Sequence, residues 1–257
     1  MAEVNELAGV ASPRRQLNLF YLIDTSYSMN GQKIESINQV MPEVIDLVAD
    51  ISNNNQDNAF ITVSCLCFNT TSEWMYEKPV NATDFKWTPL TVDGCTEVGK
   101  MCNKLEKALH RGDKTNPGVM YSETGHKSPC IIILSDGEPT DDWRIEFDKL
   151  KQNAWFKAAT KVAIAIGNQA DTKMLAEFVG SEELVIGVHK IQDLKNIIRT
   201  VSCSVSKVGS QSAGTSNQNE IDQVKTDIKK TADESPTIIV NPTTNPTNQK
   251  DEWDDFK

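Results

Sequence analysis

The sequence lacks both a long hydrophobic segment and a cluster of thiol or imidazole ligands. Its longest apolar run extends from Cys130 to Leu134, far shorter than the roughly 20 residues that span a membrane. The six cysteines form no C-x-x-C pair and the three histidines are scattered, which gives zinc, iron–sulfur and thioredoxin-type chemistry little support. No apolar signal region precedes Gln16, so we expect a cytoplasmic protein with reduced cysteines.

Basic side chains are too few to dominate the charge of the chain. The 257 residues include 26 Lys and Arg against 36 Asp and Glu, which gives a formal net charge of -10. This balance argues against attraction to nucleic acid or to an anionic membrane through bulk electrostatics. We therefore expect neither nucleic acid nor a membrane as a partner. Hydrophobic residues make up 39% of the chain, as in a soluble globular protein with a core.

Short apolar strands alternate with amphipathic helices between residues 17 and 208. The predicted strands cover residues 19–23, 59–68, 73–76, 130–134, 161–167 and 184–188. The predicted helices cover residues 34–48, 98–109, 143–153, 171–179 and 191–205. This alternation predicts an α/β fold with a doubly wound, mainly parallel, Rossmann-like sheet flanked by helices. In such sheets, ligands bind at the carboxyl ends of the strands.

The composition of the chain changes near Gly209. Only ten of the last 49 residues are apolar, too few to build a separate core. We therefore divide the chain into an N-terminal extension at 1–16, a domain at 17–208, and an acidic, low-complexity, mostly disordered tail at 209–257. A marginal helix is expected at 219–233, but its apolar stripe is too thin to hold a helix by itself.

Oxygen-bearing side chains cluster where three predicted segments meet the carboxyl ends of strands. Asp24, Ser26 and Ser28 occupy every second position directly after the first strand, so a turn there can bring one carboxylate and two hydroxyls together. Thr96 stands in a glycine-containing turn before a helix, and Asp136 follows the strand at 130–134. Two carboxylates and three hydroxyls are hard oxygen donors, which select magnesium, manganese or calcium over zinc or copper. Such a set balances the charge of a dication and leaves room for an outside ligand.

The order and spacing of these residues resemble the metal-ion-dependent adhesion site of von Willebrand factor A domains, over about residues 17–206. The segments 24–35 and 135–143 are similar, more narrowly, to the bacterial TerY-like branch, which is associated with tellurite resistance and stress operons. The resemblance implies that Mg²⁺ or Mn²⁺ is bound by the two aspartates, directly or through water, and by the three hydroxyls. A carboxylate of a partner protein would complete the octahedron.

The resemblance also implies a function without catalysis. The expected protein is a cation-dependent protein-binding module, an adaptor in a bacterial stress-response or kinase/phosphatase signalling system. Its candidate partners are a serine/threonine kinase and a metal-dependent protein phosphatase.

Four residues are candidates for a partner-binding rim around the metal. Tyr27 replaces the small residue usual between the two serines, which makes this rim bulkier and more aromatic. Asp141, Asp142 and Trp143 follow the third segment. The two acids also suit the start of a helix, where the dipole favours negative charge, and the indole suits packing in the interior.

Two other functions remain open. Residues 94–100 nearly spell a phosphate-binding loop, which suggests a magnesium-dependent NTPase or hydrolase that uses the same site. Met101 stands where that motif needs a Ser or Thr for the metal, so we expect no nucleotide turnover. The second is a structural or assembly subunit, in which the metal only stabilises the arrangement of the loops.

The C-terminal end carries two aromatic residues among four acids. Trp253 and Phe256 are three residues apart, so on a helix they would share one face and fill a partner groove. Alternatively, one of the tail carboxylates binds the chain's own metal site, or the terminus is simply solvated.

Overall fold

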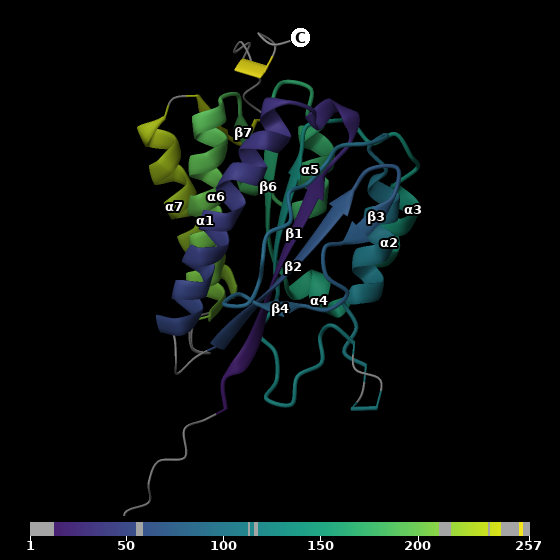
Figure 1. Ribbon diagram of the computed structural model, residues 1–257, viewed down its shortest axis with the longest axis vertical. Helices are drawn as coiled ribbons and strands as arrows, with labels where there is room; N and C mark the ends of the chain where they lie inside the picture. Colours follow the sequence, from purple (N-terminus) through teal and green to yellow (C-terminus); the bar gives the residue numbers. More distant parts are fainter. Residues whose placement is uncertain are drawn as a thin grey trace, which may run out of the picture.

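A single sheet, covered by helices on both faces, forms the body of the protein (Figure 1). The computed structural model describes residues 13–54, 59–112, 114–115, 118–210, 217–235, 237–242 and 252–253. The strands are β1 Arg15–Asp24, β2 Ala59–Phe68, β3 Ser72–Trp74, β4 Val80–Asn81, β5 Cys130–Ser135, β6 Thr160–Ile166, β7 Val185–Val188 and β8 Ile238–Val240. Their order is β3-β2-β1-β5-β6-β7-β8, and β4 also pairs with β2.

The five central strands, β2-β1-β5-β6-β7, are all parallel, whereas β3, β4 and β8 pair antiparallel at the edges. The prediction of a doubly wound, mainly parallel α/β sheet is therefore confirmed. Strand β1 lies in the middle, and its residues from Leu17 onward are buried because helices cover both faces. This explains the near-continuous apolar sequence of β1.

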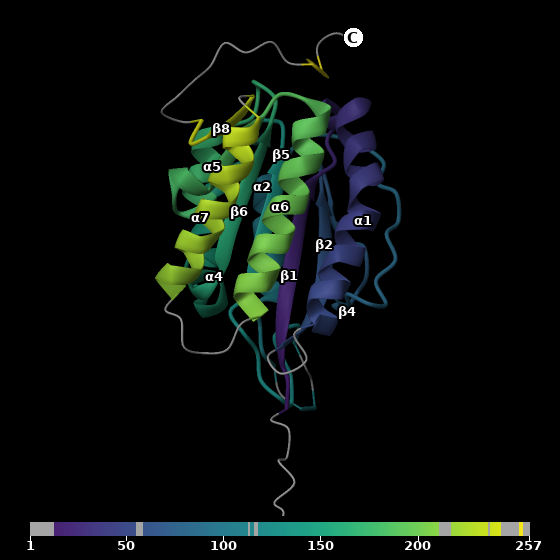
Figure 2. The same cartoon turned by 90° about the vertical axis from the view of Figure 1, so that its left-hand side faces the viewer.

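The helices divide between the two faces of the sheet. They are α1 Gln32–Asn54, α2 Val98–Ala108, α3 Arg144–Leu150, α4 Ala154–Ala158, α5 Thr172–Val179, α6 Ile191–Ser210 and α7 Asn217–Glu234. Helices α1, α6 and α7 lie on one face, and α2, α3, α4 and α5 lie on the other (Figures 1 and 2). None of the helices in the described part of the chain is long and apolar enough to cross a membrane.

The structure differs from the predicted tail over residues 217–240. Helix α7 packs on α6, where Val224 and Ile228 are fully buried and the Ser204 hydroxyl donates to Asp227 Oδ2 at 2.7 Å. Strand β8 extends the sheet beyond β7. The sequence did not predict this packing because the thin apolar stripe of α7 is stabilised by a distant element rather than by the helix itself.

The other boundary also moves, because β1 begins at Arg15, inside the predicted N-terminal extension at 1–16. Residues 1–12, 211–216, 243–251 and 254–257 lie outside the described residues, and so does Phe256. The predicted disorder of those parts of the tail stays a prediction.

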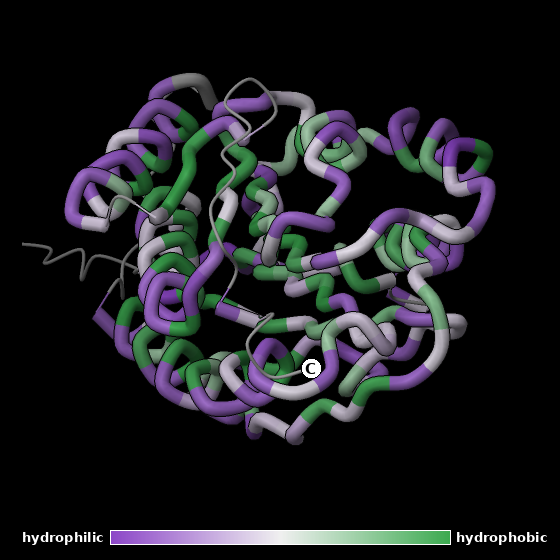
Figure 3. The backbone as a smooth tube through the Cα atoms, turned by 90° about the horizontal axis from the view of Figure 1, so that it is seen from above, coloured by the Kyte–Doolittle hydropathy of each residue, from purple (hydrophilic) through white to green (hydrophobic). Residues whose placement is uncertain are grey.

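All the parallel strands end at the same edge of the sheet. Figure 3 looks along the strands and shows hydrophilic segments on the outer sides of the helices, with hydrophobic segments toward the sheet. Because the layers bury the strands along their length, polar side chains that follow β1, β5 and β6 are collected at this edge. The candidate site lies there.

Candidate metal centre

Asp24, the last residue of β1, is held in a single orientation. Its side chain is fully buried, and Oδ1 accepts a hydrogen bond from the Ser26 backbone N–H at 2.9 Å. Oδ2 accepts from the Ser135 hydroxyl at 2.7 Å. Burial raises the pKa of Asp24 to about 6, and the nearby Asp136 charge adds to this rise while the hydrogen bonds oppose it. The carboxylate is thus positioned before any ligand arrives.

The loop after β1 turns the two serine hydroxyls toward each other. A short 3-10 helix at Tyr27–Met29 bends the chain, and Ser26 Oγ lies 3.0 Å from Ser28 Oγ. Ser28 Oγ donates to Asp136 Oδ1 at 2.6 Å, across to the loop after β5. The Tyr27 N–H donates to the Gly94 carbonyl at 3.0 Å, which ties this loop to the segment before α2.

Thr96 and Gly137 bring the remaining loops into the same space. The Thr140 N–H donates to the Thr96 carbonyl at 2.8 Å, so the segment before α2 is fixed to the loop after β5. A Cβ added to Gly137 would lie 3.2 Å from Thr96 Oγ1 and 3.5 Å from Ser28 Oγ. The glycine therefore keeps open the space between these two hydroxyls.

Lys33, which sequence reasoning missed, completes the charge pattern. Asp136 is fully buried, and its Oδ2 forms an ion pair of 2.5 Å with Lys33 Nζ. Lys33 Nζ also donates to the Ser28 carbonyl at 3.2 Å. The sequence offered one signal for this residue, because a lysine in the first turn of a helix faces the wrong end of the dipole and needs a compensating anion.

The structure thus brings together all five residues predicted to bind metal. They provide only carboxylate and hydroxyl oxygens, and Gly137 leaves room between two of them. In the described ranges, no group of three or more His, Cys, Asp or Glu side chains is arranged to hold a metal. The donor set fits a hard divalent cation such as Mg²⁺ or Mn²⁺, and its role as a ligand set stays a prediction.

A hollow of about 530 Å³ opens beside these hydroxyls. Its lining is Ser26, Tyr27, Ser28, Gly94, Cys95, Thr96, Gly137, Glu138, Thr140, Asn168, Gln169 and Ala170. Tyr27 is 67% exposed and belongs to this lining, and its predicted role in a partner-binding rim stays a prediction. The contribution of residues 168–170, from the loop after β6, was not predicted, because only the strand order places that loop beside the metal centre. We call this space the metal hollow.

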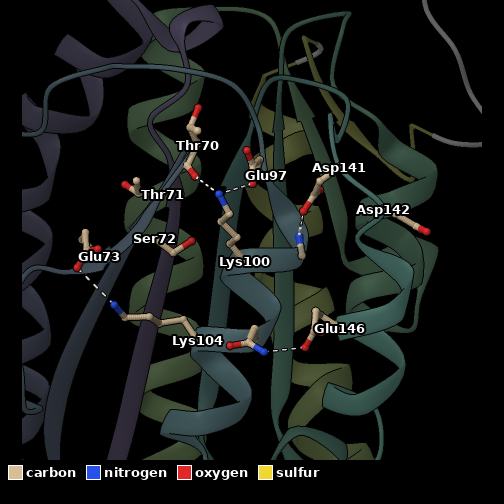
Figure 4. Close-up of a pocket in the computed structure, with 12 residues that line it drawn as sticks. Thr70, Thr71, Ser72, Glu73, Glu97, Lys100, Lys104, Asp141, Asp142 and Glu146 are labelled. Carbon is tan, nitrogen blue, oxygen red and sulfur yellow. Dashed lines mark hydrogen bonds and ion pairs between the residues drawn. The ribbon is translucent and has the colours of Figure 1, made fainter.

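The other three predicted rim residues do not line the metal hollow. Asp141 and Asp142 line a second hollow of about 570 Å³, drawn in Figure 4, which we call the α2 hollow. Asp141 Oδ2 accepts from the Gly99 N–H at 2.8 Å, at the start of α2. Trp143 is only 4% exposed and packs on Phe147, with ring centroids 5.1 Å apart. A role for these three residues in partner binding stays a prediction.

The near-match to a phosphate-binding loop forms the start of α2. Lys100 Nζ lies 2.7 Å from Glu97 Oε2 and donates to the Thr70 carbonyl at 2.7 Å (Figure 4). The side chain of Met101 is fully buried. The lysine is therefore engaged within the α2 hollow and does not line the metal hollow.

The tail residue Trp253 packs on the domain. Its side chain is 9% exposed and joins the hydrophobic core. The preceding Glu252 bonds to the start of α6: its N–H donates to the His189 carbonyl at 3.0 Å, and its Oε2 accepts from the Ile191 N–H at 2.9 Å. An acid at the amino end of a helix is favoured by the helix dipole. The indole is thus docked against its own domain.

Comparison with known proteins supports the fold. No protein-family model matches the sequence, and no curated protein does. Among solved structures, a von Willebrand factor type A protein from Catenulispora acidiphila is 16% identical, with a TM-score of 0.53 over 75% of this chain and 43% of that one. The ArnB paralog VWA2 from Sulfolobus acidocaldarius is 18% identical, with a TM-score of 0.51 over 74% of this chain and 46% of that one.

A third similar structure is proximal thread matrix protein 1 from the mussel byssus, with a zinc-occupied MIDAS motif. It is 18% identical, with a TM-score of 0.52 over 77% of this chain and 47% of that one. The present chain thus spans less than half the length of each of these three proteins. At these identities the likeness concerns the fold, and this chain has the fold of von Willebrand factor type A domains.

Proposed function

We propose that this chain is a non-enzymatic protein-binding module that depends on a divalent cation, Mg²⁺ or Mn²⁺. The observation that carries the proposal is the convergence of three hydroxyls and two buried carboxylates at the carboxyl edge of the sheet. The metal-bearing motif named in the mussel protein of the same fold supports a divalent cation here.

Each residue has a distinct part in this proposal. Asp24 and Asp136 supply the negative charge that a dication requires, and both are fixed by hydrogen bonds or an ion pair. Ser26, Ser28 and Thr96 supply neutral oxygens, so the five protein donors would balance the charge of the dication and leave one position of an octahedron for an outside ligand. A bound cation would act as a Lewis acid with a position open to an outside carboxylate.

The outside carboxylate is proposed to belong to a protein partner. The metal hollow is open enough for a side chain, and the exposed Tyr27 beside it offers an amphipathic contact of the kind enriched at interfaces. The resemblance to the TerY-like branch extends the proposal to an adaptor in a bacterial stress response, with a serine/threonine kinase or a metal-dependent phosphatase as partner. This extension depends on the sequence alone.

An enzyme that uses the same cation is the alternative, and no specific observation favours it. The lining of the metal hollow includes no histidine or lysine, and Glu138 is its only carboxylate. Lys100, the only lysine of the near-match loop, is paired with Glu97 in the α2 hollow.

A pull-down with and without chelator tests the proposal. We expect a partner, identified by mass spectrometry, to be retained by the wild type in Mg²⁺, released by chelator, and lost with Asp136→Ala. Lys100→Ala is the matched control, because it removes a paired charge from the neighbouring hollow and should retain the partner. Capture that is indifferent to chelator and to Asp136→Ala would contradict the proposal and favour a structural role for the site.

A further inference from the structure

Among the described residues, Lys33 is the cationic side chain that pairs with Asp136, one of the two carboxylates of the centre. Its ammonium bonds to Asp136 Oδ2 and to the Ser28 carbonyl, and its side chain is only 14% exposed. The two groups it contacts belong to the two segments that carry four of the five predicted ligands.

The position of this lysine is unfavourable without its partners. It lies in the first turn of α1, where the helix dipole opposes a positive charge. Lysine is also among the residues least often buried. The buried Asp136 carboxylate offsets both costs, and Lys33 in turn neutralises a buried charge that lies near Asp24.

The charges of the centre can be added from these residues. Asp24 and Asp136 contribute two negative charges and Lys33 one positive charge, so the centre without a dication carries -1. A dication would bring the total to +1, whereas the same centre without Lys33 would be neutral. The lysine therefore disfavours the cation and favours an anion that binds beside it.

We propose that Lys33 is the internal counterion of the centre and sets its preference for an anionic ligand. Its ammonium lies against Asp136 Oδ2, and a dication bound at that oxygen would displace it. It then leaves a positive charge beside the metal hollow that favours a carboxylate over a neutral group. This inference rests on the proposed function and names the residue that makes the centre selective for acidic partners.

The test is a calorimetric titration of Mg²⁺ into the full chain and three variants. Lys33→Met keeps the length of the side chain and removes its charge, so its affinity for Mg²⁺ should rise about tenfold, the effect of one modest ion pair. Lys33→Arg restores the charge and should bind Mg²⁺ like the wild type. Lys100→Met makes the same change in net charge at the α2 hollow and should remain within about twofold.

Acetate is the probe for the anion, titrated by NMR into each protein at saturating Mg²⁺. Lys33→Met should bind acetate several-fold more weakly than the wild type, although it binds Mg²⁺ more tightly. A merely structural role for Lys33 would not produce these opposite changes. In chelator, Lys33→Met should unfold at a lower temperature than the wild type, because Asp136 loses its counterion, and saturating Mg²⁺ should remove most of this difference.

The possible failures are distinguishable. Equal or weaker Mg²⁺ binding by a folded Lys33→Met variant, beside normal binding by the wild type, overturns the role of Lys33 alone. Tighter Mg²⁺ binding with unchanged acetate affinity overturns its role in ligand preference. Absence of Mg²⁺ binding by the wild type overturns the proposed function and this inference together.

Discussion

The carboxyl edge of the sheet carries two hollows of similar volume, about 530 Å³ at the metal centre and about 570 Å³ beside α2. The α2 hollow has five acidic residues in its lining, namely Glu73, Glu97, Asp141, Asp142 and Glu146. The metal hollow has only Glu138 in its lining, together with the buried Asp24 and Asp136 behind it. By a count of acidic side chains, the α2 hollow would be the better cation site.

The arrangement of the oxygen donors, rather than the number of acids, favours the metal centre. In the α2 hollow, Glu97 pairs with Lys100, Glu73 lies 3.3 Å from Lys104, and Asp141 accepts from a backbone N–H of α2 (Figure 4). In the metal centre, buried carboxylates and hydroxyls from three loops converge on one space. Convergence and burial of oxygen donors, rather than the number of acids, therefore mark the candidate cation site.

The largest expected difference between the hollows follows from removing one aspartate from each. Asp136→Ala should lower the affinity for Mg²⁺ by about 100-fold or more, because it removes a ligand carboxylate and leaves Lys33 beside Asp24. Asp141→Ala should leave that affinity within about twofold and instead weaken the start of α2, at a cost of about 1 kcal/mol in the free energy of unfolding. Calorimetry measures the Mg²⁺ affinity, and chemical denaturation measures the free energy of unfolding. Equal losses of Mg²⁺ affinity in the two variants would contradict the assignment of the cation to the metal centre.

The next effect is a dependence of Mg²⁺ binding on pH. Burial raises the pKa of Asp24 to about 6, and a proton on this carboxyl would compete with a cation bound there. Lowering the pH from 7 to 5 should therefore weaken Mg²⁺ binding about tenfold, as measured by calorimetry. An affinity that stays constant between these pH values would mean that Asp24 does not titrate there or does not bind the cation.

The same carboxyl predicts how stability changes with pH in chelator. Its pKa is higher in the folded chain than its ordinary value of 3.8, so folding favours the protonated form. The contribution of Asp24 to stability should fall by up to about 3 kcal/mol as the pH rises from 4 to 7. Urea unfolding of the wild type and of Asp24→Asn measures this, and the variant should lose less stability over that range. A steeper loss in the variant would contradict the assignment.

Substitution of one glycine at each hollow should have smaller effects, on Mg²⁺ affinity at the metal centre and on stability at the α2 hollow. Gly137→Ala should weaken Mg²⁺ binding several-fold with little loss of stability, because the added Cβ crowds Thr96 Oγ1 and Ser28 Oγ without striking backbone. Gly99→Ala should lower the free energy of unfolding by about 1–3 kcal/mol, since its Cβ would lie 2.6 Å from Asp141 Oδ2 and 3.1 Å from the Trp143 Cα. Its effect on Mg²⁺ affinity should be small. The reverse pattern would place the cation in the α2 hollow.

The smallest expected signal is nucleotide turnover. We expect no sustained hydrolysis of ATP or GTP, because Lys100 is engaged by Glu97 and Met101 supplies no metal ligand. A phosphate-release assay on the wild type and on Lys100→Ala checks this. Turnover that disappears in the variant would make the α2 hollow a catalytic site and would favour the NTPase alternative.

The sequence predicted the parts of the centre that depend on local spacing. Asp24, Ser26 and Ser28 alternate at the end of one strand and Asp136 follows another, so parallel pairing alone brings them together. The ion pair of Lys33 with Asp136 was not predicted, because it depends on the direction in which α1 starts after the loop that follows β1. The packing of α7 was missed because Val224 and Ile228 are buried by α6, an element that no local pattern identifies as their partner.

Titration of Mg²⁺ into the wild type and into a Ser26→Ala, Ser28→Ala double variant tests the central claim most directly. The double variant keeps both aspartates, Lys33 and every acid of the α2 hollow, and it removes only the two converging hydroxyls. We predict that the wild type binds one Mg²⁺ per chain and that the double variant binds at least about tenfold more weakly, since each lost ligand weakens a metal site. Equal affinity in the two proteins would contradict the assignment of the cation to this centre.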